Sequence, residues 1–76
     1  MIVGNIYKHK NNTDVAIRIL KLFYIPEKRV YNVKISWINI GPHQWFDMNL
    51  TQRINIRAED IPDWQCIVET PKHRRG

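Results

Sequence analysis

Residues 14–40 decide the fold: they read Asp14-Val-Ala-Ile-Arg-Ile-Leu-Lys-Leu-Phe-Tyr-Ile25, then Pro26-Glu-Lys-Arg29, then Val30-Tyr-Asn-Val-Lys-Ile-Ser-Trp-Ile-Asn-Ile40. The first and last of these segments are rich in β-branched and aromatic residues, which suit a pleated, half-buried surface. Pro26 presets a backbone angle that favours a turn. We therefore predict one long β-hairpin with its turn at Pro26–Arg29.

The pairing of the two arms follows if Ile25 faces Val30. The resulting apolar pairs are Tyr24 with Tyr31, Leu22 with Val33 and Leu20 with Ile35 on one face, and Ile17 with Ile38 and Val15 with Ile40 on the other. In both arms the apolar residues thus move from one face of the hairpin to the other at the same distance from the turn. A flat hairpin does not explain this shared change. The pattern predicts a strongly bent or bulged hairpin that curls into a small barrel.

The flanking segments supply the remaining elements. We predict a first strand at residues 2–10, a loop at 41–49 that Gly41-Pro42 opens, a short strand at 50–57, one helical turn at 58–61 that Pro62 stops, and a last strand at 64–69. A chain of 76 residues can hold only one domain, which we assign to residues 1–70. Residues 71–76 are predicted to form a basic, disordered tail.

This order of elements resembles an SH3-like barrel, the small fold shared by SH3, Tudor, KOW and many prokaryotic and phage modules. The resemblance rests on the hairpin 14–40 and on Ala58-Glu-Asp-Ile-Pro-Asp-Trp64 leading into residues 65–69. It implies an all-β, five-stranded barrel with one short helical turn before the last strand. The chain lacks the acidic-aromatic run of proline-binding SH3 domains and the spaced glycines of a KOW motif, so the resemblance implies no ligand. The small size and the Ile- and Asn-rich composition also resemble a phage accessory protein.

Composition narrows the class of protein. A single cysteine, Cys66, excludes an internal disulfide framework and fits a reducing compartment. Residues 1–5 lack the features of a signal peptide, and nothing approaches the length of a membrane span. We expect a soluble cytoplasmic protein, in the host cytoplasm if a phage encodes it. Its net charge of +5 favours polyanionic partners.

No catalytic or metal-binding pattern is present. The residues His9, His43, His73 and Cys66 lack the paired spacings that bind zinc. The acidic residues Glu59, Asp60 and Asp63 fall at the expected helical turn, where carboxylates complement the helix dipole. There is no glycine-rich phosphate loop and no nucleophile–base pair. We expect a protein that is not an enzyme and has no cofactor.

The polar face of the hairpin is the first candidate binding surface. In the predicted register Lys21 opposes Lys34, Phe23 opposes Asn32, and Arg18 lies over Trp37. Basic residues interleaved with aromatic ones are typical of surfaces that bind single-stranded nucleic acid. The candidate residues are Lys8, Lys10, Arg18, Lys21, Lys34, Trp37, Arg53 and Arg57, with the tail 72–75 adding affinity. The alternative is an ordinary solvated sheet face with Trp37 in the core.

The loop 41–49 is the second candidate, because Trp45, Phe46 and Met48 lie where most loops are polar. Such a cluster suits a protein interface. It also suits a lid that plugs the barrel and enlarges a small core.

Two functions remain open from the sequence. The first is binding of RNA or single-stranded nucleic acid through the basic face. The second is a protein-binding regulator or inhibitor that acts on an acidic partner through the loop 41–49; the partner is a host or defence enzyme if a phage encodes the protein. The sequence leaves the oligomeric state open.

Overall fold

The computed structural model describes residues 1–42 and 44–69. It contains one antiparallel sheet of five strands in the order β4-β3-β2-β1-β5. In chain order the elements are β1 (Ile6–His9), β2 (Val15–Ile25), β3 (Val30–Asn39), β4 (Phe46–Arg57), the 3₁₀ helix η1 (Ala58–Asp63) and β5 (Trp64–Val68). The all-β class, the five strands and the helical turn before the last strand are confirmed. The tail predicted for residues 71–76 lies outside the described residues.

Several element boundaries differ from the prediction. The first strand begins at Ile6 and not at residue 2, because the chain turns at Gly4, whose φ is 95°. The fourth strand begins at Phe46, four residues before its expected start. Pro62 lies inside η1 and does not stop it. A 3₁₀ helix this short tolerates a proline, since few of its N–H groups have helical partners.

The hairpin register is correct near the turn and wrong beyond Lys21. Lys21 faces Lys34 and Ile25 faces Val30 as predicted, but a β-bulge follows between Ile19 and Lys21. The observed pairs beyond it are Ile19 with Ile35, Arg18 with Ser36, Ile17 with Trp37, Ala16 with Ile38 and Val15 with Asn39. These replace the predicted pairs of Leu20 with Ile35, Arg18 with Trp37, Ile17 with Ile38 and Val15 with Ile40. One extra residue on β2, Leu20, shifts every later pair by one position.

The bulge decides which side chains share a face. Arg18 and Lys21 are three residues apart and would point to opposite faces of a regular strand. With Leu20 inserted between them, both occupy the face that also carries Lys34. We call this the outer face. The inner face carries the alternate residues of β3, among them Ile35.

The larger hydrophobic core lies on the inner face. Its buried members are Tyr7, Ile17, Ile19, Val33, Ile35 and Ile56. The N-terminal Met1, Ile61 of η1 and Trp64 of β5 pack against it. Burial of an isoleucine side chain stabilises a fold by roughly 1.5–3 kcal/mol, so these residues dominate its stability. A smaller cluster of Ile6, Ala16 and Ile38 lies at the other end, on the outer face.

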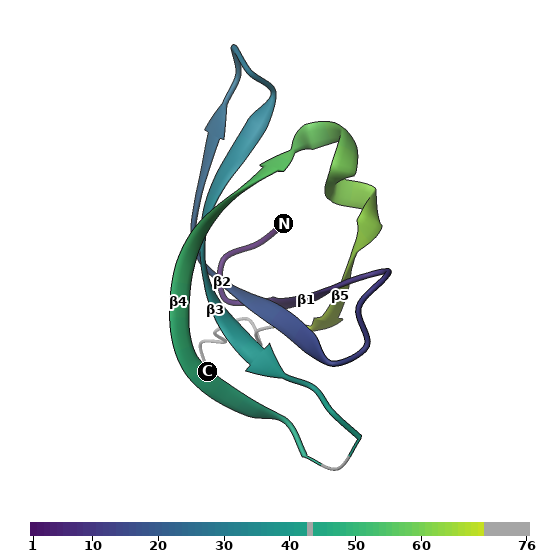
Figure 1. Ribbon diagram of the computed structural model, residues 1–76. Helices are drawn as coiled ribbons and strands as arrows, with labels where there is room; N and C mark the ends of the chain where they lie inside the picture. The colour runs from purple at the N-terminus through teal and green to yellow at the C-terminus, as the bar shows by residue number, and fades with distance from the viewer. Residues whose placement is uncertain (43, 70–76) are drawn as a thin grey trace, which may run out of the picture.

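The sheet is strongly curved, and Figure 1 shows β4 bending along its length before the chain crosses through η1 to β5. The N-terminal segment lies on the inner side of this curve. The strand order places β4 and β5 at the two edges, and no ladder joins them among the described residues. The expected closure into a barrel is therefore not confirmed; the structure shows an open, curled sheet.

Candidate nucleic-acid interface

The outer face of β2, β3 and β4 presents polar side chains in rows that cross the three strands. The register gives three successive rows: Arg18–Ser36–Thr51, Lys21–Lys34–Arg53 and Phe23–Asn32–Asn55. We call Lys21, Lys34 and Arg53 the outer cation row. Directly opposed residues of antiparallel strands lie on the same face, about 4.5–5.5 Å apart at Cβ. Three cations are therefore close neighbours on adjacent strands.

Amide side chains orient Arg53 within this row. Nη1 of Arg53 donates to Oδ1 of Asn32 at 3.0 Å, and Nδ2 of Asn32 donates to Oδ1 of Asn55 at 3.0 Å. An arginine side chain has five N–H donors in a planar fork, so most of its donors stay available. A neutral amide fixes the guanidinium without cancelling its charge.

The outer cation row has no acidic partner among the described residues. The nearest carboxylate in register is Asp47, which faces Ile38 across a shift in the β3–β4 ladder. Oδ1 of Asp47 accepts from Oγ of Ser36 at 3.1 Å and from the N–H of Asn49 at 2.7 Å. Asn49 has a φ of 57°, so Asp47 stabilises a bulge in β4. The carboxylate thus has a structural role and leaves the cations unpaired.

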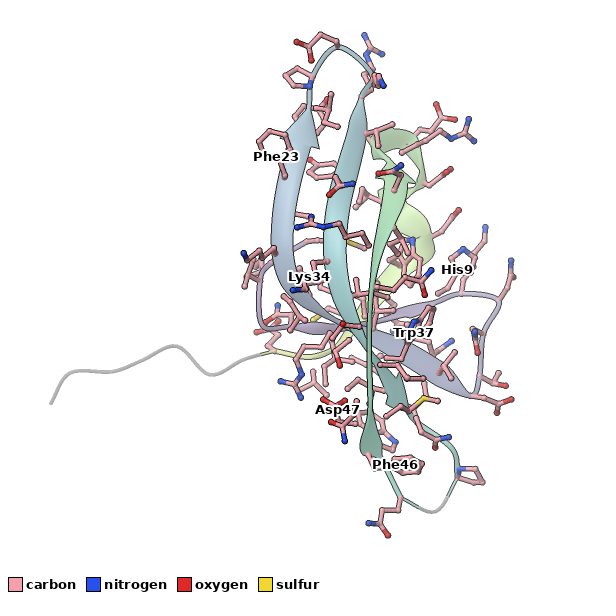
Figure 2. All side chains as sticks on the ribbon, turned by 60° about the vertical axis from the view of Figure 1, so that its left-hand side comes forward. His9, Phe23, Lys34, Trp37, Phe46 and Asp47 are labelled. Carbon is pink, nitrogen blue, oxygen red and sulfur yellow. The ribbon has the colours of Figure 1, made fainter. Side chains whose placement is uncertain are left out.

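Two more residues extend the surface. Arg18 lies in the row next to the outer cation row, opposite Ser36. Phe23 lies in the row on the other side and is 67% exposed. Figure 2 shows Phe23 and Lys34 on the same side of the sheet. The face therefore combines four cations with one exposed aromatic ring.

The other three predicted cations are engaged elsewhere. Nζ of Lys8 donates to the carbonyl oxygens of His9 and Asn12 in the turn after β1. Lys10 forms an ion pair with Asp63 at 3.1 Å. These contacts leave both lysines outside the outer cation row.

Arg57 is held by the acidic residues of η1. It pairs with Glu59 at 3.4 Å and with Asp60 at 3.2 Å. The hydrogen bond to Asp60, followed by the charges of Asp60 and Glu59, raises the pKa of Arg57. Its positive charge is therefore partly cancelled, although its backbone pairs with Val30 close to the outer cation row.

Trp37 lies on the inner face, opposite Ile17, and the predicted contact with Arg18 is wrong. Its Nε1 donates to Oε1 of Gln52 at 3.1 Å. Figure 2 shows β4 nearly edge-on, with Lys34 on one side and Trp37 on the other. Alternation within β3 places Trp37 on the same face as Ile35, and the bulge in β2 makes Ile17 its partner in place of Arg18.

The aromatic segment after Gly41 neither plugs the core nor forms one loop. Phe46 and Met48 belong to β4, and Phe46 faces Asn39. Trp45 is 48% and Phe46 52% exposed, and neither belongs to the two core clusters. The structure does not support the lid, and the two rings remain available to a partner.

Two further features are a metal-binding cluster and a membrane-spanning helix, and residues 1–42 and 44–69 contain neither. This part of the chain holds no group of three or more His, Cys, Asp or Glu placed to bind a metal ion. Nor does it include a helix with the length and apolar character needed to cross a membrane. His43 and the tail 72–75 lie outside the described residues. Comparisons with protein-family models, curated proteins and solved structures find no match.

Proposed function

We propose that this protein is a non-catalytic module that binds RNA or single-stranded DNA through the outer face of β2, β3 and β4. The binding residues are Arg18, Lys21, Lys34 and Arg53, with Phe23 as a stacking platform. The outer cation row carries this proposal.

The strand order supports assigning the module to the SH3-like barrels. The sequence-adjacent strands β1 to β4 form a meander, a 3₁₀ helix follows β4, and β5 returns to pair with β1. The five strands and the short helix before the last strand match the order of elements on which the resemblance rests. In this assignment the curled sheet is a barrel left open between β4 and β5, at the position that η1 spans.

The energetics of the outer cation row favour an anionic ligand. Like charges directly opposite each other destabilise a sheet by roughly 0.2–1 kcal/mol per pair. The row contains two such pairs, Lys21 with Lys34 and Lys34 with Arg53. Phosphate groups bound along the row replace this repulsion with attraction and release condensed counterions.

The shape of the surface favours a single strand over a duplex. The row spans three strands, and neighbouring strands are about 4.8 Å apart, so it matches a short length of one phosphate backbone. Phe23 offers a ring on which a base stacks, and a base is accessible only when it is unpaired. The one helix among the described residues is the short η1, which is a poor probe for a major groove.

A matched pair of triple variants tests this proposal. Lys21→Gln/Lys34→Gln/Arg53→Gln removes the outer cation row. Lys8→Gln/Lys10→Gln/Arg57→Gln also removes three positive charges, but from side chains that already contact other groups of the protein. Affinity for a short single-stranded RNA and a single-stranded DNA is measured by fluorescence anisotropy across a range of salt concentrations.

The first variant is expected to bind far more weakly. Each lost phosphate contact flattens the plot of log affinity against log salt by about 0.7 for a single strand. Loss of three contacts flattens it by about 2, whereas the second variant keeps most of the wild-type slope. Equal losses in the two variants would show that only net charge matters. Absence of binding by the wild type at about 50 mM salt would reject the proposal.

The exposed rings of Trp45 and Phe46 favour a second candidate function, which is binding of a protein partner as a regulator or inhibitor. Aromatic residues are the side chains most often responsible for interface energy. This surface lies at the β3–β4 connection, beyond Asp47 and away from the outer cation row. It becomes the leading candidate if the wild type binds neither nucleic acid.

A further inference from the structure

The inner face has a cavity next to the turn between β1 and β2. Its volume is about 260 Å³, and it is lined by His9, Asn11, Asn12, Val15, Ala16, Ile17, Trp37 and Trp64. Pockets for whole small molecules usually measure about 300–1,000 Å³. This cavity, which we call the aromatic cleft, is therefore sized for one flat ring system.

Each indole of the aromatic cleft is held by a neighbour. Trp37 is fixed through the hydrogen bond from its Nε1 to Gln52. Trp64 packs edge-on against His9, with ring centroids 5.0 Å apart and planes at 81°. In the described part of the chain the two indoles make no ring contact with each other. Two fixed indoles thus line the cleft without contacting each other.

The rim of the cleft offers polar groups that suit the edge of a base. Nδ1 of His9 accepts the N–H of Asn11 at 3.1 Å, which leaves the ring proton of a neutral His9 on Nε2 as a donor. The side-chain amide of Asn11 has no hydrogen-bond partner among the described residues. An asparagine amide provides both a donor and an acceptor, the pair of groups that recognises base edges.

The cleft is linked to the outer cation row across the edge strand β4. Gln52, which holds Trp37, faces inward opposite Ile35, and the next residue, Arg53, faces outward opposite Lys34. Within the described part of the chain, β4 is an edge strand of the sheet. Figure 2 shows this strand nearly edge-on, with Lys34 on one side and Trp37 and His9 on the other. A nucleic-acid chain that crosses the edge at Arg53 therefore arrives on the side of Trp37.

Charges next to the cleft favour a base over a phosphate. Asp60 and Asp63 line an adjoining depression that shares His9, Asn11 and Trp64 with the cleft. Both carboxylates repel phosphate, although each pairs with a cation. A neutral ring is free of this repulsion.

We propose that the aromatic cleft binds one unpaired nucleobase of the strand whose phosphates lie on the outer cation row. This inference rests on the proposed function. The base inserts against Trp37 and Trp64, and Asn11 and His9 bind its edge. Stacking of a base on an aromatic side chain contributes about 1–3 kcal/mol by alanine substitution.

Tryptophan fluorescence tests this inference directly. The sequence has three tryptophans, so Trp45→Phe leaves Trp37 and Trp64, both in the cleft, as the only indole fluorophores. This variant is titrated with a short oligoadenylate and with an abasic strand of equal length and charge. Binding is followed by anisotropy of a labelled strand, and the cleft by indole emission.

We expect both strands to bind, with quenching of indole emission by the oligoadenylate alone. Adding Asn11→Ala to this variant should weaken oligoadenylate binding and leave abasic binding unchanged. If both strands bind and indole emission does not change, the cleft does not bind a base. The proposal that the outer cation row binds phosphates would then still hold. Failure of both strands to bind would overturn the proposed function and the inference together.

Discussion

The two faces of β3 differ sharply although they share one backbone. On the inner face Ile35 is fully buried and belongs to the main core. On the outer face its neighbour Lys34 lies between two other cations, and no carboxylate of the described residues pairs with it. Ile35 therefore helps to hold the fold together, whereas Lys34 costs stability through charge repulsion and is free to bind an anionic ligand. Substitutions at Ile35 and at Lys34 should consequently change the free energy of unfolding in opposite directions.

The largest change in the free energy of unfolding is expected from substitution of Ile35. Ile35→Ala removes buried methyl groups and leaves a cavity, which typically costs about 2–5 kcal/mol of unfolding free energy. Urea unfolding followed by circular dichroism measures the loss. The conservative Ile35→Val should cost only about 0.5–1.5 kcal/mol. A small effect of Ile35→Ala would show that the inner face is not the core.

Substitution of Lys34 is expected to raise the free energy of unfolding, by a smaller amount. Lys34→Thr removes the central charge of the outer cation row and introduces a residue with high β-propensity. The same unfolding experiment should show a gain of about 0.2–1 kcal/mol. Affinity for single-stranded RNA should fall in parallel. A loss of stability would mean that Lys34 makes a favourable contact and that its charge is not strained.

The part of the hairpin nearest the turn was predictable from the sequence. The pairs from Ile25–Val30 to Lys21–Lys34 follow from counting outward from the turn, and all of them are correct. From Leu20 onward the count fails, because this one inserted residue moves each later partner by one. The shared change of apolar face did indicate a bulge. It did not indicate which strand holds the extra residue, since that depends on packing against the rest of the fold.

The bulge is also tied to contacts that are remote in sequence. The N–H of Ile19 donates to the carbonyl of Asn5 at 3.0 Å, and its carbonyl accepts the N–H of Gly4 at 2.8 Å. The N-terminal segment thus pairs with β2 next to the inserted Leu20. Hydrophobic periodicity within the hairpin contains no information about these bonds.

The candidate site was predicted only in part, because some of its residues follow from local patterns and others depend on contacts that are remote in sequence. Lys21 and Lys34 lie in the reliable part of the register, and alternation within the fourth strand supplied Arg53. By contrast, the engagement of Lys10 by Asp63 and of Arg57 by Asp60 depends on how η1 packs. The aromatic cleft was missed because it joins Trp37 to Trp64 and His9 from three separate strands.

Backbone amide chemical shifts test the central claim most directly. The ¹⁵N-labelled protein is titrated with a short single-stranded RNA at low salt, and each amide shift is followed. The account predicts that the largest changes fall at residues 18–23, 32–36 and 51–55, which form the outer face of β2, β3 and β4. Changes confined to residues 41–49, or no changes at a several-fold excess of RNA, would contradict it.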